Sequence, residues 1–113
     1  MIHVCSLARL HTTVEETGAR HIVTLINDET LVVRPECVDA ENHLFLGMHD
    51  IPAEMHGYRA PAKAHVQQLI EFVQRWDRST PLVVHCYAGI SRSTAAAFVI
   101  ACALNPQRDE RMI

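Results

Sequence analysis

This sequence lacks several features that would mark it for a membrane, for export or for nucleic acid. No apolar run in its 113 residues approaches the ~18–20 residues that a membrane span needs. Its first residues, 1–5, show no basic segment followed by a long apolar stretch, as a secretory signal would. Ten Lys and Arg stand against thirteen Asp and Glu, for a net charge of -3, whereas nucleic-acid binders are normally basic. We therefore expect a cytoplasmic protein with no membrane or nucleic-acid partner.

Disulfide and zinc patterns are also missing. The four cysteines (Cys5, Cys37, Cys86 and Cys102) are widely and unevenly spaced, unlike those of a small disulfide scaffold. The chain has eight histidines, but it contains no Cys-x-x-Cys pair and no His-x-x-x-His pair of the kind that binds zinc. We expect reduced thiols, no metal and no cofactor.

The composition suits one folded domain over residues 1–113. It is 49% hydrophobic and 20% charged, which excludes a disordered tail, a collagen-like repeat and a low-complexity linker. The length is that of a single domain of roughly 100–150 residues. No internal repeat or linker divides it.

Short apolar, β-branched runs alternate with helical patterns along the chain. We predict strands at 2–5, 21–26, 43–48 and 81–84, and helices near 13–17, from Pro61 and over 94–104. The first helix rests on a capping-box pattern at Thr13–Glu16, with Gly18 behind it. This alternation predicts an α/β fold with a central, mostly parallel sheet flanked by helices.

The last two predicted helices carry further expectations. The helix over 94–104 is apolar nearly all round, so we expect it to be buried at the centre of the fold. Another helix is expected to begin at Pro106, because a capping asparagine, a first-turn proline and acidic residues occur together there. The sequence stops about two turns later, so we expect a C-terminally truncated domain.

Cys86 lies where a short strand runs into a loop that ends at the buried helix. A loop at a helix N-terminus presents unpaired N–H groups in a positive dipole, which suits a phosphate-like anion. Gly89 lets the loop turn, and Arg92 can give two parallel hydrogen bonds to phosphate oxygens. The same groups would stabilise a thiolate at Cys86. A buried core cysteine is the alternative interpretation, but the neighbouring residues disfavour it.

The run His85-Cys86-x5-Arg92-Ser93 resembles the signature of the cysteine-based protein tyrosine phosphatase superfamily, especially its dual-specificity branch. The resemblance implies that Cys86 attacks phosphorus to form a cysteinyl-phosphate and that Ser93 helps the sulfur to leave. It also implies that Arg92 and the loop N–H groups stabilise the transition state. His85 would position the loop and tune the thiolate. The implied phosphate-binding loop comprises His85, Tyr87, Ala88, Gly89, Ile90, Ser91 and Arg92, and a phosphate or sulfate ion would fit it.

The resemblance also implies an aspartate that protonates the leaving oxygen from a loop upstream of the nucleophile. Asp50 is the best candidate, because it follows a predicted strand and precedes Cys86 by 36 residues. Glu54 is the fallback. Asp39 lies before its strand, at the wrong end, and Asp77 ends the Pro61 helix. An ordinary solvated carboxylate is the alternative interpretation of Asp50.

The leading functional hypothesis is a cysteine-dependent tyrosine or dual-specificity phosphatase that acts on a phosphorylated protein or a small phosphate monoester. A phosphoinositide or RNA 5′-phosphatase would use the same chemistry, although the loop has no lysine for the extra charge. A non-catalytic phosphate-binding module is the third hypothesis. A regulatory disulfide from Cys5 or Cys37 to Cys86 remains open.

Overall fold

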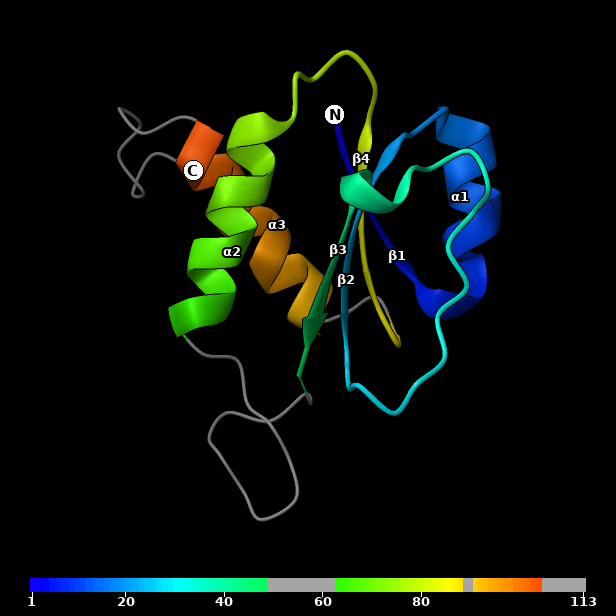
Figure 1. Cartoon of the computed structure of the whole chain (residues 1–113), viewed down its shortest axis with the longest axis horizontal. Coiled ribbons are helices and arrows are strands. Elements are labelled where there is room, and N and C mark those ends of the chain that lie inside the picture. The colour runs from blue at the N-terminus through cyan, green and yellow to red at the C-terminus, as the bar shows by residue number, and fades with distance from the viewer. Residues whose placement is uncertain (49–62, 89–90, 105–113) are drawn as a thin grey trace.

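The computed structural model describes residues 1–48, 63–88 and 91–104. The elements follow one another as β1 (Ile2–Ser6), η1 (Leu7–Arg9), α1 (Leu10–Thr17), β2 (His21–Ile26), η2 (Ala40–Asn42), β3 (His43–Gly47), α2 (Lys63–Arg75), β4 (Leu82–Cys86) and α3 (Ser91–Leu104), where η marks a single 3-10 turn. Figure 1 shows α2 and α3 together on one side of the strands and α1 on the other. No helix among these residues is long and apolar enough to cross a membrane.

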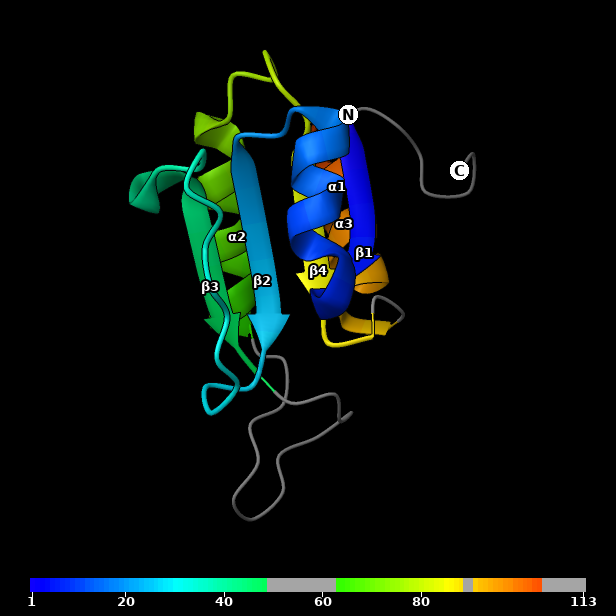
Figure 2. The same cartoon turned by 90° about the vertical axis from the view of Figure 1, so that its right-hand side faces the viewer.

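The strands form one sheet in the order β1-β4-β2-β3, and each neighbouring pair is parallel. The predicted α/β fold with a central parallel sheet is therefore confirmed. Figure 2 shows the sheet nearly face-on, with α1 in front of it and α2 and α3 behind. Because all strands run the same way, their carboxyl ends meet at one edge of the sheet, which is where parallel α/β folds place ligands.

β4 is the most protected strand, since all five of its residues are buried. Such a continuous apolar run is typical of a parallel strand that is covered on both faces. The prediction ended this strand at residue 84, but the structure extends it through His85 and Cys86. Backbone pairing of β4 with β1 continues to Ser6 and Cys86, so the nucleophile candidate belongs to the rigid sheet.

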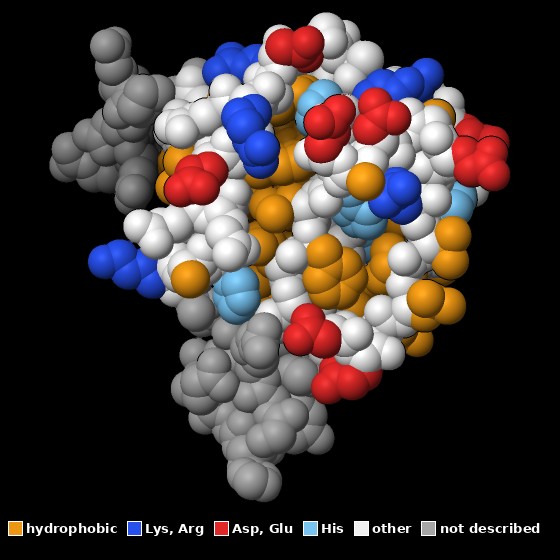
Figure 3. All heavy atoms as spheres, in the orientation of Figure 1, with side chains coloured by type: hydrophobic (Ala, Val, Ile, Leu, Met, Phe, Trp, Pro, Cys, Tyr) orange, Lys and Arg blue, Asp and Glu red, His pale blue; other side chains and the backbone are white. Residues whose placement is uncertain are grey.

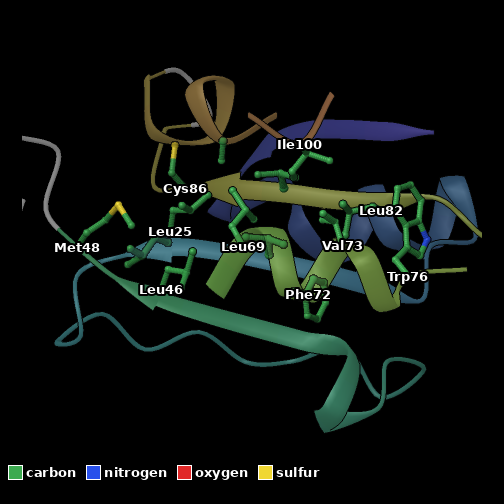
Figure 4. Packing of buried hydrophobic residues seen from close by; sticks show 14 residues of the cluster. Leu25, Leu46, Met48, Leu69, Phe72, Val73, Trp76, Leu82, Cys86 and Ile100 are labelled. Carbon is green, nitrogen blue, oxygen red and sulfur yellow. The ribbon is translucent and has the colours of Figure 1, made fainter. Parts of the chain in front are cut away.

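Side chains alternate between two apolar clusters, one on each face of the sheet. The larger cluster packs α2 and α3 against the sheet and includes Leu25, Leu82 and Cys86 (Figure 4). We call this side the α2/α3 face. The smaller cluster packs Leu10 and Val14 of α1 against the opposite side, which we call the α1 face. This alternation holds along β4 and along β2 as far as Leu25, whereas Ile26, at the end of β2, belongs to the larger cluster together with Leu25.

The predicted start of the first helix was wrong. α1 begins at Leu10 rather than Thr13, and no side chain caps it, so the capping box does not form. The hydroxyl of Thr17 instead donates to the Thr13 carbonyl, an i−4 bond within the helix. The predicted end is confirmed, because Gly18 adopts φ 74° and its N–H donates to the Val14 carbonyl. Only glycine takes this left-handed conformation without strain.

The predicted burial of the helix over 94–104 is only half right. α3 begins at Ser91, and it buries Ser93, Ala96 and Ile100 against the rest of the domain. Phe98, however, is 48% exposed. Among the described residues, α3 packs on α2, β4, β1 and β2, all toward its buried side. A helix that is apolar all round gives no periodicity to show which side will be covered. The helix predicted from Pro106 lies outside the described residues.

Candidate active site

Cys86 is the last residue of β4, at the carboxyl edge of the sheet. α3 begins five residues later, at Ser91, so the intervening loop joins a strand end directly to a helix N-terminus. Cys86 is 2% exposed and points into the α2/α3 face (Figure 4). This placement agrees with the strand–loop–helix context predicted from sequence.

Ser93 is the group that the structure brings to the sulfur. Its Oγ lies 3.2 Å from Cys86 Sγ, within the wider range for a sulfur hydrogen bond, and Ser93 is completely buried. The hydroxyl comes from the first turn of α3, where the helix dipole is positive. A hydroxyl donor and a positive helix end both favour a thiolate over a thiol.

Arg92 joins the start of α3 to the end of β3. Its Nη1 donates to the Met48 carbonyl over 3.1 Å, while its Nε is buried without a hydrogen-bond partner among the described residues. Since a buried guanidinium N–H without an acceptor is costly, this edge of Arg92 is suited to an anion. Met48 lies two residues before Asp50, so Arg92 is bonded to the end of β3 that leads toward the proposed acid.

An apolar cavity of about 110 Å³ adjoins Arg92. Residues from α2, α3 and the ends of β2 and β3 line it, including Leu25, Val66 and Val99. Figure 3 shows hydrophobic side chains along the seam between α2 and β3, on the face seen in Figure 1. The cavity gives the guanidinium an apolar wall, which strengthens its interaction with an anion.

The beginning of the loop is fixed from the neighbouring strand. The N–H of Leu7, just after β1, donates to the Tyr87 carbonyl over 3.2 Å. The side chain of Tyr87 is 64% exposed, and Ala88 is exposed too. Gly89, Ile90 and the side chain of Ser91 lie outside the described part, so their predicted places in the loop stay predictions.

The acid candidates separate into two groups. Asp50 and its fallback Glu54 lie outside the described residues. Asp39 precedes η2 and β3, and Asp77 lies between α2 and β4. Both are therefore at the amino edge of the sheet, about 15 Å (one strand length) from the edge that holds Cys86. Hydrogen bonds from Ser79 to the carboxylate of Asp77 lower its pKa. Neither position is near Cys86, and the role of Asp50 stays a prediction.

Sequence reasoning missed a buried polar network behind Cys86. Thr24 Oγ1 lies 2.6 Å from His85 Nε2 and 2.7 Å from His43 Nε2. Burial lowers the pKa of His85 to about 4, and nearby His43 adds to the effect. His85 is therefore neutral at pH 7. The available signal was a threonine within the otherwise apolar run of β2, a position that calls for a polar partner.

The cysteine positions bear on the disulfide hypothesis. No disulfide joins the four cysteines, all of which are described. Cys5 pairs with His85 across β1 and β4, and its side chain packs on the α1 face, whereas that of Cys86 packs on the α2/α3 face. Burial raises the pKa of Cys5. Because the two Cβ vectors point to opposite faces, Cys5 cannot bridge to Cys86 without movement of the backbone. Among the described residues, no group of three His, Cys, Asp or Glu side chains could hold a metal ion.

The family model that describes a polymorphic toxin system, DSP-PTPase phosphatase, matches residues 5–107. The chain belongs to this family. The match includes every element from β2 to α3 and the whole segment from Cys86 to Ser93. The resemblance to dual-specificity and tyrosine phosphatases is therefore confirmed, and the chain is a phosphatase domain of this type.

Two solved structures share the fold of this DSP-PTPase domain. PTP-2 phosphatase from Cydia pomonella superposes with a TM-score of 0.72 at 19% identity, covering 98% of this chain and 70% of that one. OH1 from the Orf virus, described as a tyrosine phosphatase with triple substrate specificity, gives a TM-score of 0.61 at 17% identity. That comparison covers 93% of this chain and 59% of OH1. A comparison with curated proteins found no match.

Proposed function

We propose that this domain hydrolyses phosphate monoesters through a cysteinyl-phosphate on Cys86. The observation that carries the proposal is the contact between Cys86 Sγ, at the end of β4, and Ser93 Oγ, in the first turn of α3, which are 3.2 Å apart. A buried sulfur with a hydroxyl partner at a helix N-terminus is arranged for a thiolate rather than for core packing.

In the first step, the thiolate of Cys86 attacks phosphorus as the bond from phosphorus to the leaving oxygen breaks. Arg92 presents its unpartnered Nε edge to the phosphoryl oxygens, while its Nη1 stays on Met48. The N–H groups of the loop add the remaining stabilisation of charge. Asp50 gives its proton to the leaving oxygen, so the alcohol or phenol departs neutral.

In the second step, water attacks the phosphorus of the cysteinyl-phosphate and the bond to sulfur breaks. Asp50, now ionised, takes a proton from the water. The hydroxyl of Ser93 donates to the departing sulfur and stabilises its negative charge. Inorganic phosphate leaves, and the enzyme returns to its starting state with Asp50 protonated.

Phosphorylated proteins are the proposed substrates, with phosphotyrosine or mixed specificity. The support is the family's dual-specificity description and the absence of lysine among the variable loop residues Tyr87, Ala88, Ile90 and Ser91. We further propose that the domain serves in a polymorphic toxin system, as the family is described. A reducing cytoplasm is the proposed site of action, because it keeps Cys86 available as a thiolate.

A substrate panel tests this function. Phosphotyrosine, phosphoserine and phosphothreonine peptides, an inositol polyphosphate and an RNA 5′-triphosphate are each incubated with the domain, and phosphate release is measured. We expect release from phosphotyrosine peptides above all. Preferred release from the inositol phosphate or the RNA would reassign the substrate, and release from none of them would contradict the function.

The acid is tested by a matched pair of aspartates. Asp50→Asn should lower kcat for a phosphotyrosine peptide by about 10²–10⁴-fold, because general acid catalysis supplies that much. Asp39→Asn, at the opposite edge of the sheet, should stay within about twofold of the wild type. Steady-state kinetics decide the outcome. Normal activity of the Asp50 variant would move the role to Glu54.

A further inference from the structure

The hydrogen bonds of Thr24 reach across the sheet from β2 to its neighbours on both sides. Its single hydroxyl contacts Nε2 of His85, on β4, and Nε2 of His43, on β3, at 2.6 and 2.7 Å. Thr24 and His85 are completely buried, and His43 is partly buried. Thr24 and His85 lie on the α1 face, because their strand neighbours Val23, Leu25, Val84 and Cys86 lie in the cluster of the α2/α3 face. Leu44, which follows His43 in β3, packs on that cluster too, so His43 lies on the α1 face as well.

Hydrogen counting couples the tautomers of the two histidines. A hydroxyl has one proton, so Thr24 can donate to only one Nε2 and must accept from the other. One ring therefore carries its proton on Nε2 and the other carries it on Nδ1. The network is satisfied only when the two neutral rings have opposite tautomers, and the loss of either partner would release the other ring from this constraint.

The surroundings of His85 leave its ring dependent on Thr24. The Nδ1 of His85 has no hydrogen-bond partner among the described residues, so the bond between its Nε2 and Thr24 is the one that orients the buried ring. His85 directly precedes Cys86 in β4, so the orientation of this ring bears on the backbone at the nucleophile.

We propose that Thr24 and His43 are positioning residues that hold the ring of His85 in one tautomer and orientation and thereby fix the backbone of Cys86 for attack on phosphorus. The hydrogen-bonded series joins His43, Thr24 and His85, and His85 is the residue directly before the nucleophile. It acts from the α1 face, where none of these side chains touches substrate. Burial lowers the pKa of His43, and the positive charge of Arg34 lowers it further, so this ring is also neutral at pH 7. The role in catalysis rests on the proposed function, whereas the tautomer does not.

Two readouts independent of turnover test the proposal. The first is the ring ¹⁵N signals of His85 by NMR, which separate the two neutral tautomers. The second is the pH dependence of iodoacetamide alkylation at Cys86, followed by peptide mass spectrometry so that the other cysteines do not interfere. Thr24→Val removes the hydroxyl and Thr24→Ser keeps it. His43→Leu removes the second ring, whereas His43→Gln keeps an amide that can either donate to or accept from the Thr24 hydroxyl.

In Thr24→Val and His43→Leu we expect mixed tautomers at His85 and an alkylation midpoint raised by roughly half to one pH unit, as expected for the loss of one hydrogen bond. We also expect kcat to fall about tenfold with KM unchanged, by analogy with outer-shell residues that orient a ligand. Thr24→Ser and His43→Gln should behave as the wild type. Thr80→Val is the matched control, since the buried hydroxyl of Thr80 has no partner among the described residues.

An unchanged His85 tautomer and alkylation midpoint in folded Thr24→Val would overturn the proposal, as would an equal shift in Thr80→Val. If Thr24→Val does not fold, the comparison of His43→Leu with His43→Gln tests the same proposal, because His43 is the less buried end of the network. If the wild type releases no phosphate while the tautomer and midpoint shift as expected, the network is confirmed and only the proposed function fails.

Discussion

The two faces of this sheet do different work, although the same strands build both. On the α2/α3 face, Cys86 belongs to an apolar cluster with Leu25 and Ile100, and its sulfur contacts the buried hydroxyl of Ser93. On the α1 face, the adjacent residue His85 enters a hydrogen-bonded series with Thr24 and His43. Consecutive residues of β4 thus supply a nucleophile to one side and its support to the other. The comparison teaches that a parallel strand can present a reactive group on one face while a hydrogen-bonded network on the other face supports the adjacent residue.

The largest expected difference between the faces is seen in two cysteines on neighbouring strands. Cys86→Ser should lower phosphate release by at least about 10⁴-fold, because a hydroxyl cannot replace the thiolate nucleophile. Cys5→Ser, on the α1 face, should stay within about twofold of the wild type. Both variants are assayed with the same phosphotyrosine peptide, after circular dichroism shows that they are folded. Substantial turnover by the Cys86 variant would contradict the mechanism.

The apolar face should also dominate stability. Ile100→Ala removes a completely buried side chain and should lower the free energy of unfolding by about 2–5 kcal/mol. Thr80→Val removes a buried hydroxyl that has no partner among the described residues, so it should change this free energy by less than about 1 kcal/mol. Urea unfolding measures both variants. Equal losses would show that packing against α3 contributes little.

The polar face should make stability depend on pH. The pKa of His85 is about 4 in the folded chain and about 6.5 when unfolded, so the unfolded state binds more protons between these values. The contribution of His85 to the free energy of unfolding is therefore fully present above pH 6.5. It falls as the pH drops toward 4, by about 3 kcal/mol from His85 alone. Burial lowers the pKa of His43 and of His21, which adds to the loss in the same direction.

Urea unfolding at intervals from pH 8 to pH 4 checks this sign. His43→Leu, which removes part of the α1-face network, should slightly reduce the slope of the free energy of unfolding against pH. His21→Leu, away from the network, should also reduce this slope, without changing the tautomer of His85. A stability that rises as the pH falls through 6.5 would refute the assignment of His85 as a buried neutral ring.

The apolar face was the predictable part of the molecule. The β-branched run at His21–Ile26 and the apolar run at 81–84 are each bounded by polar or turn-forming residues, so composition located both strands, although the second continues to Cys86. The residues from Cys86 to Ser93 combine a strand end with a helix start, and the resemblance to the phosphatase signature implied that Ser93 acts on the sulfur. Local sequence is sufficient wherever one element determines the geometry.

What could not be predicted depends on contacts between elements. Thr24, His43 and His85 lie on three strands, and only the order β4-β2-β3 brings them together. The start of α1 at Leu10 follows from the 3-10 turn before it, whereas the hydroxyl of Thr13 turned out not to cap the helix. Phe98 is exposed because α3 is covered on its other side, and the sequence of a helix that is apolar all round does not show which side will be covered.

The most direct test of the account is to isolate the covalent intermediate. Ser93→Ala should slow the departure of sulfur more than its attack, so that phosphate accumulates on the enzyme. The variant is mixed with an aryl phosphate, quenched with acid within the first turnover and digested for mass spectrometry. The account predicts a burst of one phenol per active site and phosphate on the peptide that contains Cys86, absent in the double variant with Cys86→Ser. Full turnover with phosphate on no cysteine, or on another residue, would contradict it.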